Sequence, residues 1–121
     1  MNKIITIKLL AIRVIVMGFI HIAATFSPMI AGKLAPLSEG MQRACIYFSL
    51  MCGAMLILGG SIVHMLCGKA KEHPFLRTPL FLTYSMLVVD GILAVCFMPH
   101  NPCAWVIFVL SILLLVVPKY K

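Results

Sequence analysis

The chain is poor in acidic residues, with three aspartates and glutamates against ten lysines and arginines among 121 residues. Charge of either sign is scarce, because charged residues make up 11% of the chain and hydrophobic residues 63%. A soluble domain of this size would leave a large apolar surface in contact with water. The composition therefore excludes an ordinary soluble domain. It predicts an integral membrane protein whose single transmembrane domain covers residues 1–121.

Several patterns that carry chemistry are also missing. The five cysteines form no Cys-x-x-Cys motif, which excludes the usual dithiol redox site. The sequence has no glycine-rich phosphate loop, no paired carboxylates and no histidine–cysteine cluster dense enough for a metal. The basic residues are scattered rather than gathered in a patch with aromatics, so the net charge of +7 does not indicate nucleic-acid binding. We therefore expect no metal and no nucleic-acid partner, and an enzyme is the least favoured class.

Four apolar runs dominate what is present. A transmembrane helix needs about 20 apolar residues, and the pattern predicts spans at residues 6–27, 44–67, 79–98 and 102–118. The fold class expected is all-α, an integral membrane four-helix bundle. The first loop, residues 27–42, is broken by prolines and glycines and is expected to form a short surface or re-entrant segment.

Loop charges predict the orientation of these spans. Lys3 and Lys8 lie on the N-terminal side of the first span, three basic residues lie within 68–77 and two lie in the tail 118–121. The first loop carries one basic residue, Lys33, and the third loop, residues 99–102, carries none. The positive-inside rule then places both termini in the cytoplasm (N-in/C-in), in a bacterial cytoplasmic (inner) membrane. A cleaved signal peptide is the alternative for the N-terminal run, but Arg13 and His21 fit poorly in its apolar region.

Asp90 is the acidic residue inside an apolar run. A carboxylate at mid-membrane costs roughly 2.5–3.5 kcal/mol, so it should face protein or a polar cavity. His21 is expected at a similar depth, and Arg13 lies within about 80° of His21 on the first helix. We predict that Asp90, His21 and Arg13 form an intramembrane polar core for a ligand or a proton. The alternatives are a purely structural hydrogen bond and an Arg13 side chain that extends to the interface.

Small residues follow one side of the second span. Ser49, Gly53, Gly60 and His64 fall within about 60° of one another, which predicts a helix-packing seam at the bundle centre or at a dimer contact. A haem held between His21 and His64 is disfavoured, because the two histidines are expected at different depths. A haem with one histidine ligand, or shared between subunits, stays open.

Cysteines near the third loop offer a candidate disulfide. Cys96 and Cys103 flank this short turn and would face the outer side. If that side is oxidising, the two thiols could pair. The favoured alternative is that both are small apolar fillers.

Short motifs in the first two spans resemble the DoxX-like group of small four-helix membrane proteins. These are Ile12-Arg13, Gly18-Phe-Ile-His21, Gly32-Lys33-Leu34 and the run Cys52 to Gly60. An acidic residue often found early in the group's second helix is absent here. The resemblance implies a membrane subunit that stands beside an oxidoreductase or a quinone-linked complex, and quinone is therefore a candidate cofactor.

The leading functional hypothesis is an accessory or binding subunit in the lipid bilayer, with a membrane-protein partner or a second copy of itself. One alternative is a small proton-coupled transporter that uses Asp90. Another is a membrane-embedded isomerase or reductase in which Asp90 or His21 is the acid or base.

Overall fold

The computed structural model describes residues 2–117. Within that range the chain is helical and contains no strand, which confirms the predicted all-α class. The elements are α1 (Lys3–Thr25), α2 (Pro28–Leu34), α3 (Glu39–Leu66), the short 3-10 helix η1 (Pro74–Leu76), α4 (Arg77–Phe97) and α5 (Pro102–Val116).

The helix starts are set by local sequence. Side-chain oxygens of Asn2, Ser27, Ser38 and Asn101 each accept a hydrogen bond from a backbone N–H of the helix that follows. Such caps satisfy amides that have no partner inside the helix. Because Ser38 caps α3, this helix begins at Glu39, five residues before the predicted span at 44.

Three of the predicted spans have the length and hydropathy needed to cross a membrane. They are α1, α3 and the segment Pro74–Phe97. The fourth predicted span corresponds to α5, which is apolar but has 15 residues. Its predicted end at residue 118, and the tail lysines at 119 and 121, lie outside the described residues. The broken first loop contains α2, a helix of seven residues.

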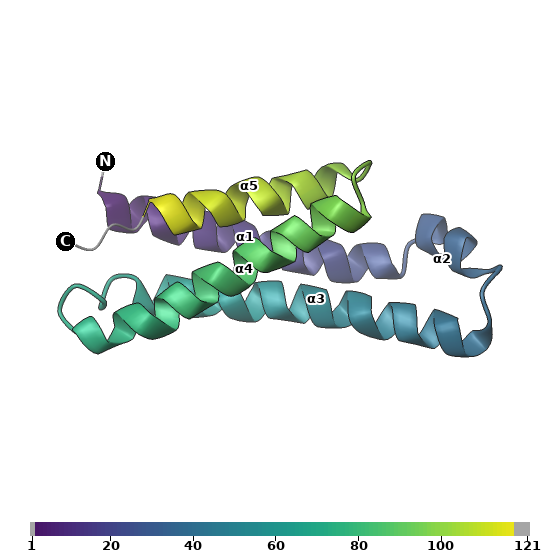
Figure 1. The fold of residues 1–121 in the computed structure, drawn as a ribbon, viewed down its shortest axis with the longest axis horizontal. Coiled ribbons are helices and arrows are strands. Elements are labelled where there is room, and N and C mark those ends of the chain that lie inside the picture. The colour runs from purple at the N-terminus through teal and green to yellow at the C-terminus, as the bar shows by residue number, and fades with distance from the viewer. Residues whose placement is uncertain (1, 118–121) are drawn as a thin grey trace.

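The long helices lie side by side, with α1 packed on α3 and α5, and α4 packed on α5 and α3. Figure 1 shows that the start of α1, the end of α5 and the α3–α4 connection share one end of the molecule. The α4–α5 turn points toward the opposite end. There α1 and α3 continue past that turn to α2 and its flanking loops.

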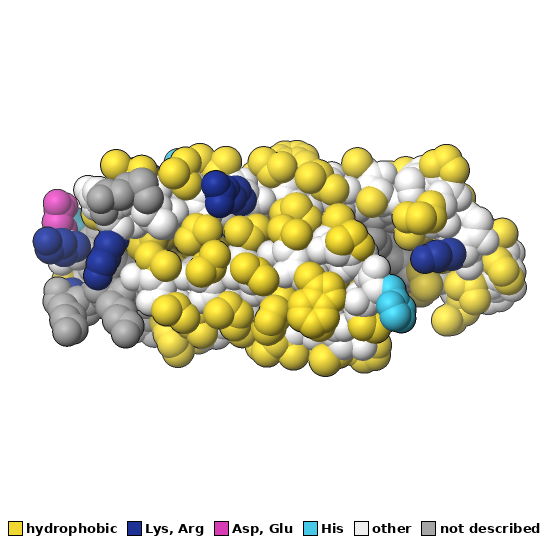
Figure 2. All heavy atoms as spheres, turned by 90° about the horizontal axis from the view of Figure 1, so that it is seen from above, with side chains coloured by type: hydrophobic (Ala, Val, Ile, Leu, Met, Phe, Trp, Pro, Cys, Tyr) yellow, Lys and Arg dark blue, Asp and Glu magenta, His cyan; other side chains and the backbone are white. Residues whose placement is uncertain are grey.

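The interior and the surface are both apolar. Ile7, Val14, Leu56, Leu87 and Leu114 are among the buried side chains of the core. Large hydrophobic side chains are also exposed along α1, α3, α4 and α5. Figure 2 shows hydrophobic atoms over most of one face, with acidic and basic side chains at one end and further basic side chains near the middle and toward the other end. An apolar exterior of this extent suggests a membrane protein.

Glycines bring the α1 and α3 backbones into contact. A Cβ added at Gly18 would lie 2.8 Å from the Gly53 carbonyl oxygen, and one added at Gly60 would lie 2.9 Å from the Ala11 carbonyl oxygen. Side chains at these positions would force the helices apart. Gly53 and Gly60, which the sequence assigns to a packing seam, therefore face α1 of the same chain.

Candidate functional site

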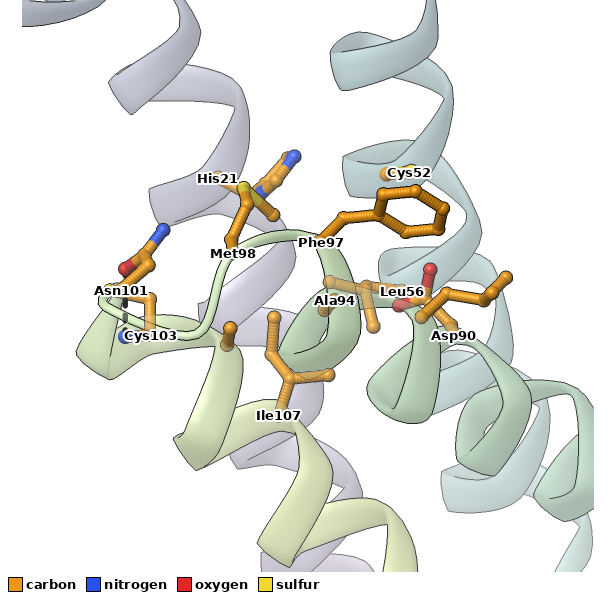
Figure 3. A pocket seen from close by; sticks show the side chains of 12 residues that line it. His21, Cys52, Leu56, Asp90, Ala94, Phe97, Met98, Asn101, Cys103 and Ile107 are labelled. Atoms are coloured by element: carbon orange, nitrogen blue, oxygen red, sulfur yellow. Dashed lines mark hydrogen bonds between the residues drawn. The ribbon is translucent and has the colours of Figure 1, made fainter.

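A partly open pocket of about 220 Å³ lies beneath the α4–α5 turn, where α1, α3, α4 and α5 meet. Figure 3 shows the side chains around it. Apolar groups supply most of the wall, including Leu56 from α3, Phe97 from α4 and Ile107 from α5. The side chains with polar atoms come from all four helices and the turn; they are His21, Cys52, Asp90, Asn101 and Cys103.

Asp90 reaches this pocket from the second half of α4. Its side chain is half-buried, and within residues 2–117 it makes no hydrogen bond and no ion pair. His21 and the Cys52 thiol are both near enough to interact with the carboxylate electrostatically. The structure thus brings Asp90 and His21 to one pocket, although the two side chains do not bond directly.

His21 is instead tied to α3 by a chain of hydrogen bonds. The Thr25 hydroxyl donates to the His21 carbonyl oxygen at 2.9 Å, so its single proton is used. The Ser49 hydroxyl must then donate to the Thr25 oxygen at 2.6 Å. The remaining contact, 3.2 Å between Ser49 Oγ and His21 Nε2, requires Nε2–H as the donor. Neutral His21 is therefore the Nε2–H tautomer, and its Nδ1 is an acceptor without a hydrogen-bond partner among the described residues.

The third predicted member of the polar core lies elsewhere. Arg13 is exposed, does not line the pocket and has no ion pair within the described chain. The reason is the orientation of α1, which packs its Ala11–Gly18 side against α3. Arg13 is about 160° from Ala11 around the helix, whereas His21 is about 80° away. The structure therefore does not bring Arg13 to the pocket with Asp90 and His21, and its exposed position fits the alternative of a side chain that extends to the interface.

The other predicted positions separate in space. His64 lies twelve residues beyond Cys52 on α3, about 18 Å along the helix. Its Nδ1 is buried and has no hydrogen-bond partner among residues 2–117, and His64 is not among the residues that line the pocket. This placement agrees with the argument against a haem held between His21 and His64. No group of three metal-ligating side chains occurs within residues 2–117.

The candidate disulfide is not formed. All five cysteines are free thiols. Cys103 lines the pocket, while Cys96 is exposed on α4. The two side chains thus occupy different surroundings on either side of the turn, which gives no reason for them to be linked.

Sequence reasoning missed some of the site. Thr25 and Ser49 turn out to be hydrogen-bond partners of His21, and Asn101 and Cys103 line the pocket from the turn. The spacing of four residues between His21 and Thr25 is a signal that a helical wheel could have provided. Nothing in the sequence indicates that the turn closes over Asp90. Comparison with family models, curated proteins and solved structures finds no match for this chain.

Proposed function

We propose that the protein is a multi-pass four-helix bundle of the bacterial inner membrane, with both termini in the cytoplasm. Three helices of sufficient length and hydropathy support this proposal. So does the placement of the α1 start, the α5 end and the basic α3–α4 connection at one end of the molecule. The positive-inside rule assigns this end to the cytoplasm. In this orientation the pocket lies in the outer half of the bilayer.

The pocket is then a binding site for the polar end of a lipophilic molecule, and the protein is an accessory or binding subunit of DoxX-like type. One observation carries this proposal. Asp90 lines a partly open apolar pocket and makes no hydrogen bond and no ion pair within the described chain. A carboxylate in such surroundings is costly unless a ligand or solvent satisfies it. A quinone and the exposed surface of a partner membrane protein are the occupants that the resemblance favours.

The first test is to purify the protein in mild detergent and to extract its bound lipids. A quinone or another amphiphile retained by the wild type should be lost in Asp90→Asn and in His21→Ala. Glu72→Gln, in the exposed α3–α4 connection, is the control that should retain it. Unchanged retention in folded Asp90→Asn and His21→Ala would show that the two side chains have only a structural role.

A small proton-coupled transporter is the second candidate. The Asp90 carboxylate favours this candidate too, because a carboxyl group that is open to a cavity can bind a proton and a transported substrate in turn. Reconstituted protein should then move protons only when its cargo is present, and Asp90→Asn should abolish this coupled movement. Proteoliposomes in which cargo moves without any proton flux would exclude this candidate.

A further inference from the structure

The polar atoms of the pocket are mainly acceptors. An ionised Asp90 can only accept hydrogen bonds. His21 commits its Nε2–H to Ser49, which leaves Nδ1 as an acceptor. The Asn101 Oδ1 caps α5 by accepting a hydrogen bond from the Cys103 N–H at 3.0 Å, so the NH₂ group is the part of this lining side chain that can donate to a ligand. None of the described residues that line the pocket is a lysine or an arginine.

The donors and acceptors of the pocket indicate the charge of its ligand. A half-buried carboxylate is stabilised by a cation that also donates hydrogen bonds. The aromatic ring of Phe97 lies in the same wall, and a cation is attracted to an aromatic face. An anion would be repelled by Asp90. A neutral carbonyl ligand such as a quinone, which the resemblance suggests, would find few donors, because the donors among the described lining residues are the Asn101 amide and the thiols of Cys52 and Cys103.

We infer that the pocket binds the primary ammonium group of a lipophilic amine, with Asp90 as its counter-ion and His21 Nδ1 as a second acceptor. This inference rests on the proposed function, because it names the chemical class of the ligand that the pocket holds. Apolar contacts with Leu56 and Ile107 would hold the carbon chain next to the charged end.

The size of the pocket limits the ligand. A cavity of about 220 Å³ is smaller than the roughly 300–1,000 Å³ typical of sites for drug-sized molecules. The ammonium and a short hydrophobic segment fill it, and the remainder of a longer molecule must leave through the open side. Aliphatic or aryl amines with an unbranched end therefore fit, and bulky quaternary ammonium groups do not.

Three probes of nearly equal shape test this inference on the unaltered protein. Phenethylammonium, 2-phenylethanol and phenylacetate carry a cation, a neutral hydroxyl and an anion on related frames. Their affinities are measured by isothermal titration calorimetry in detergent at pH 8, where free imidazole and carboxyl groups are deprotonated. The ammonium should bind at least about tenfold more tightly than the alcohol, as expected for a hydrogen bond to a charged group. Phenylacetate should bind weakest.

Variants then assign the effect to the pocket. In Asp90→Asn, which preserves shape and removes charge, the preference for the ammonium over the alcohol should disappear. Glu72→Gln removes a carboxylate outside the pocket and should keep the preference. Circular dichroism checks that both variants stay helical, and the ranking of probes on the wild type stands even if Asp90→Asn does not fold.

The outcomes separate this inference from the proposed function. If the alcohol or the carboxylate binds as tightly as the ammonium, or if folded Asp90→Asn keeps the preference, the inference is overturned while the pocket remains a binding site. If none of the three probes binds and no amphiphile is retained on purification, the proposed function fails together with the inference.

Discussion

Gly18→Ala should separate the two helices that position His21. A Cβ at this position would lie 2.8 Å from the Gly53 carbonyl oxygen and 3.1 Å from the Ile57 backbone nitrogen, whereas ordinary contact starts at 3.4 Å. Because backbone atoms cannot rotate away as a side chain can, α1 and α3 must move apart by about half an ångström. A gap of this size removes at least about a quarter of the dispersion energy of each contact between the two helices.

The expected cost follows from two opposing effects. Overpacking of a close contact costs typically 1–3 kcal/mol, and replacing a helical glycine by alanine returns up to about 1 kcal/mol. We therefore expect Gly18→Ala to lower the free energy of unfolding by up to about 2 kcal/mol relative to the wild type. The measurement is reversible unfolding in mixed micelles by titration with a denaturing detergent, followed by circular dichroism.

A matched variant separates the effect of packing on stability from the effect of helix propensity. Gly40→Ala, near the start of α3, has no neighbour within 4 Å of the added Cβ, so it should be neutral or slightly stabilising. A stability of Gly18→Ala equal to or greater than that of Gly40→Ala would refute the close approach of α1 and α3. Equal destabilisation by both variants would assign the loss to something other than this seam.

Two other predictions concern the pocket and its support. Ser49→Ala removes the α3 hydroxyl that bonds Thr25 and His21 of α1 and should lower the free energy of unfolding by about 0.6–2 kcal/mol. The control is Ser61→Ala, which should cost less because the Ser61 hydroxyl bonds the Ile57 carbonyl of its own helix. A larger loss of stability in Ser61→Ala than in Ser49→Ala would contradict these interhelical hydrogen bonds. Cys103 should react with a small maleimide faster than the fully buried Cys67 in variants that keep one of these thiols, as followed by mass spectrometry. Equal rates before unfolding would show that the pocket is closed.

Much of the helical architecture is predictable from the sequence, because apolar run length and capping residues are local signals. Ser27, Ser38 and Asn101 mark three helix starts where the structure has them. The start of α3 was placed too late, since the sequence-based span counted apolar residues and ignored the Ser38 cap. The sidedness of the bundle in the bilayer stays a prediction.

The site was only partly predictable, because it depends on how helices are rotated against each other. Depth along a helix follows from the rise per residue, so Asp90 and His21 could be matched. The rotation of a helix about its own axis does not follow from this rise. The sequence could not show that α3 packs on the Ala11–Gly18 side of α1 and that Arg13 lies away from the pocket. The role of Ser49 was missed for the same reason, since its partners lie on another helix.

The unequal lengths of the helices have a consequence for the surrounding lipid. At about 1.5 Å per residue, α5 with its 15 residues is about 22 Å long, and α3 with its 28 residues is about 42 Å long. The hydrocarbon core of a bilayer is about 30 Å thick. Hydrophobic mismatch should therefore compress the bilayer beside α5 and leave it at normal or greater thickness beside α3.

This compression would fall next to the α4–α5 turn that closes the pocket. Lipid head groups and their water would lie closer to Asp90 there than at the same height elsewhere around the protein. The short fourth helix would thus lower the cost of the carboxylate. It would also allow an amphiphile to enter the pocket laterally from the head-group layer of the bilayer.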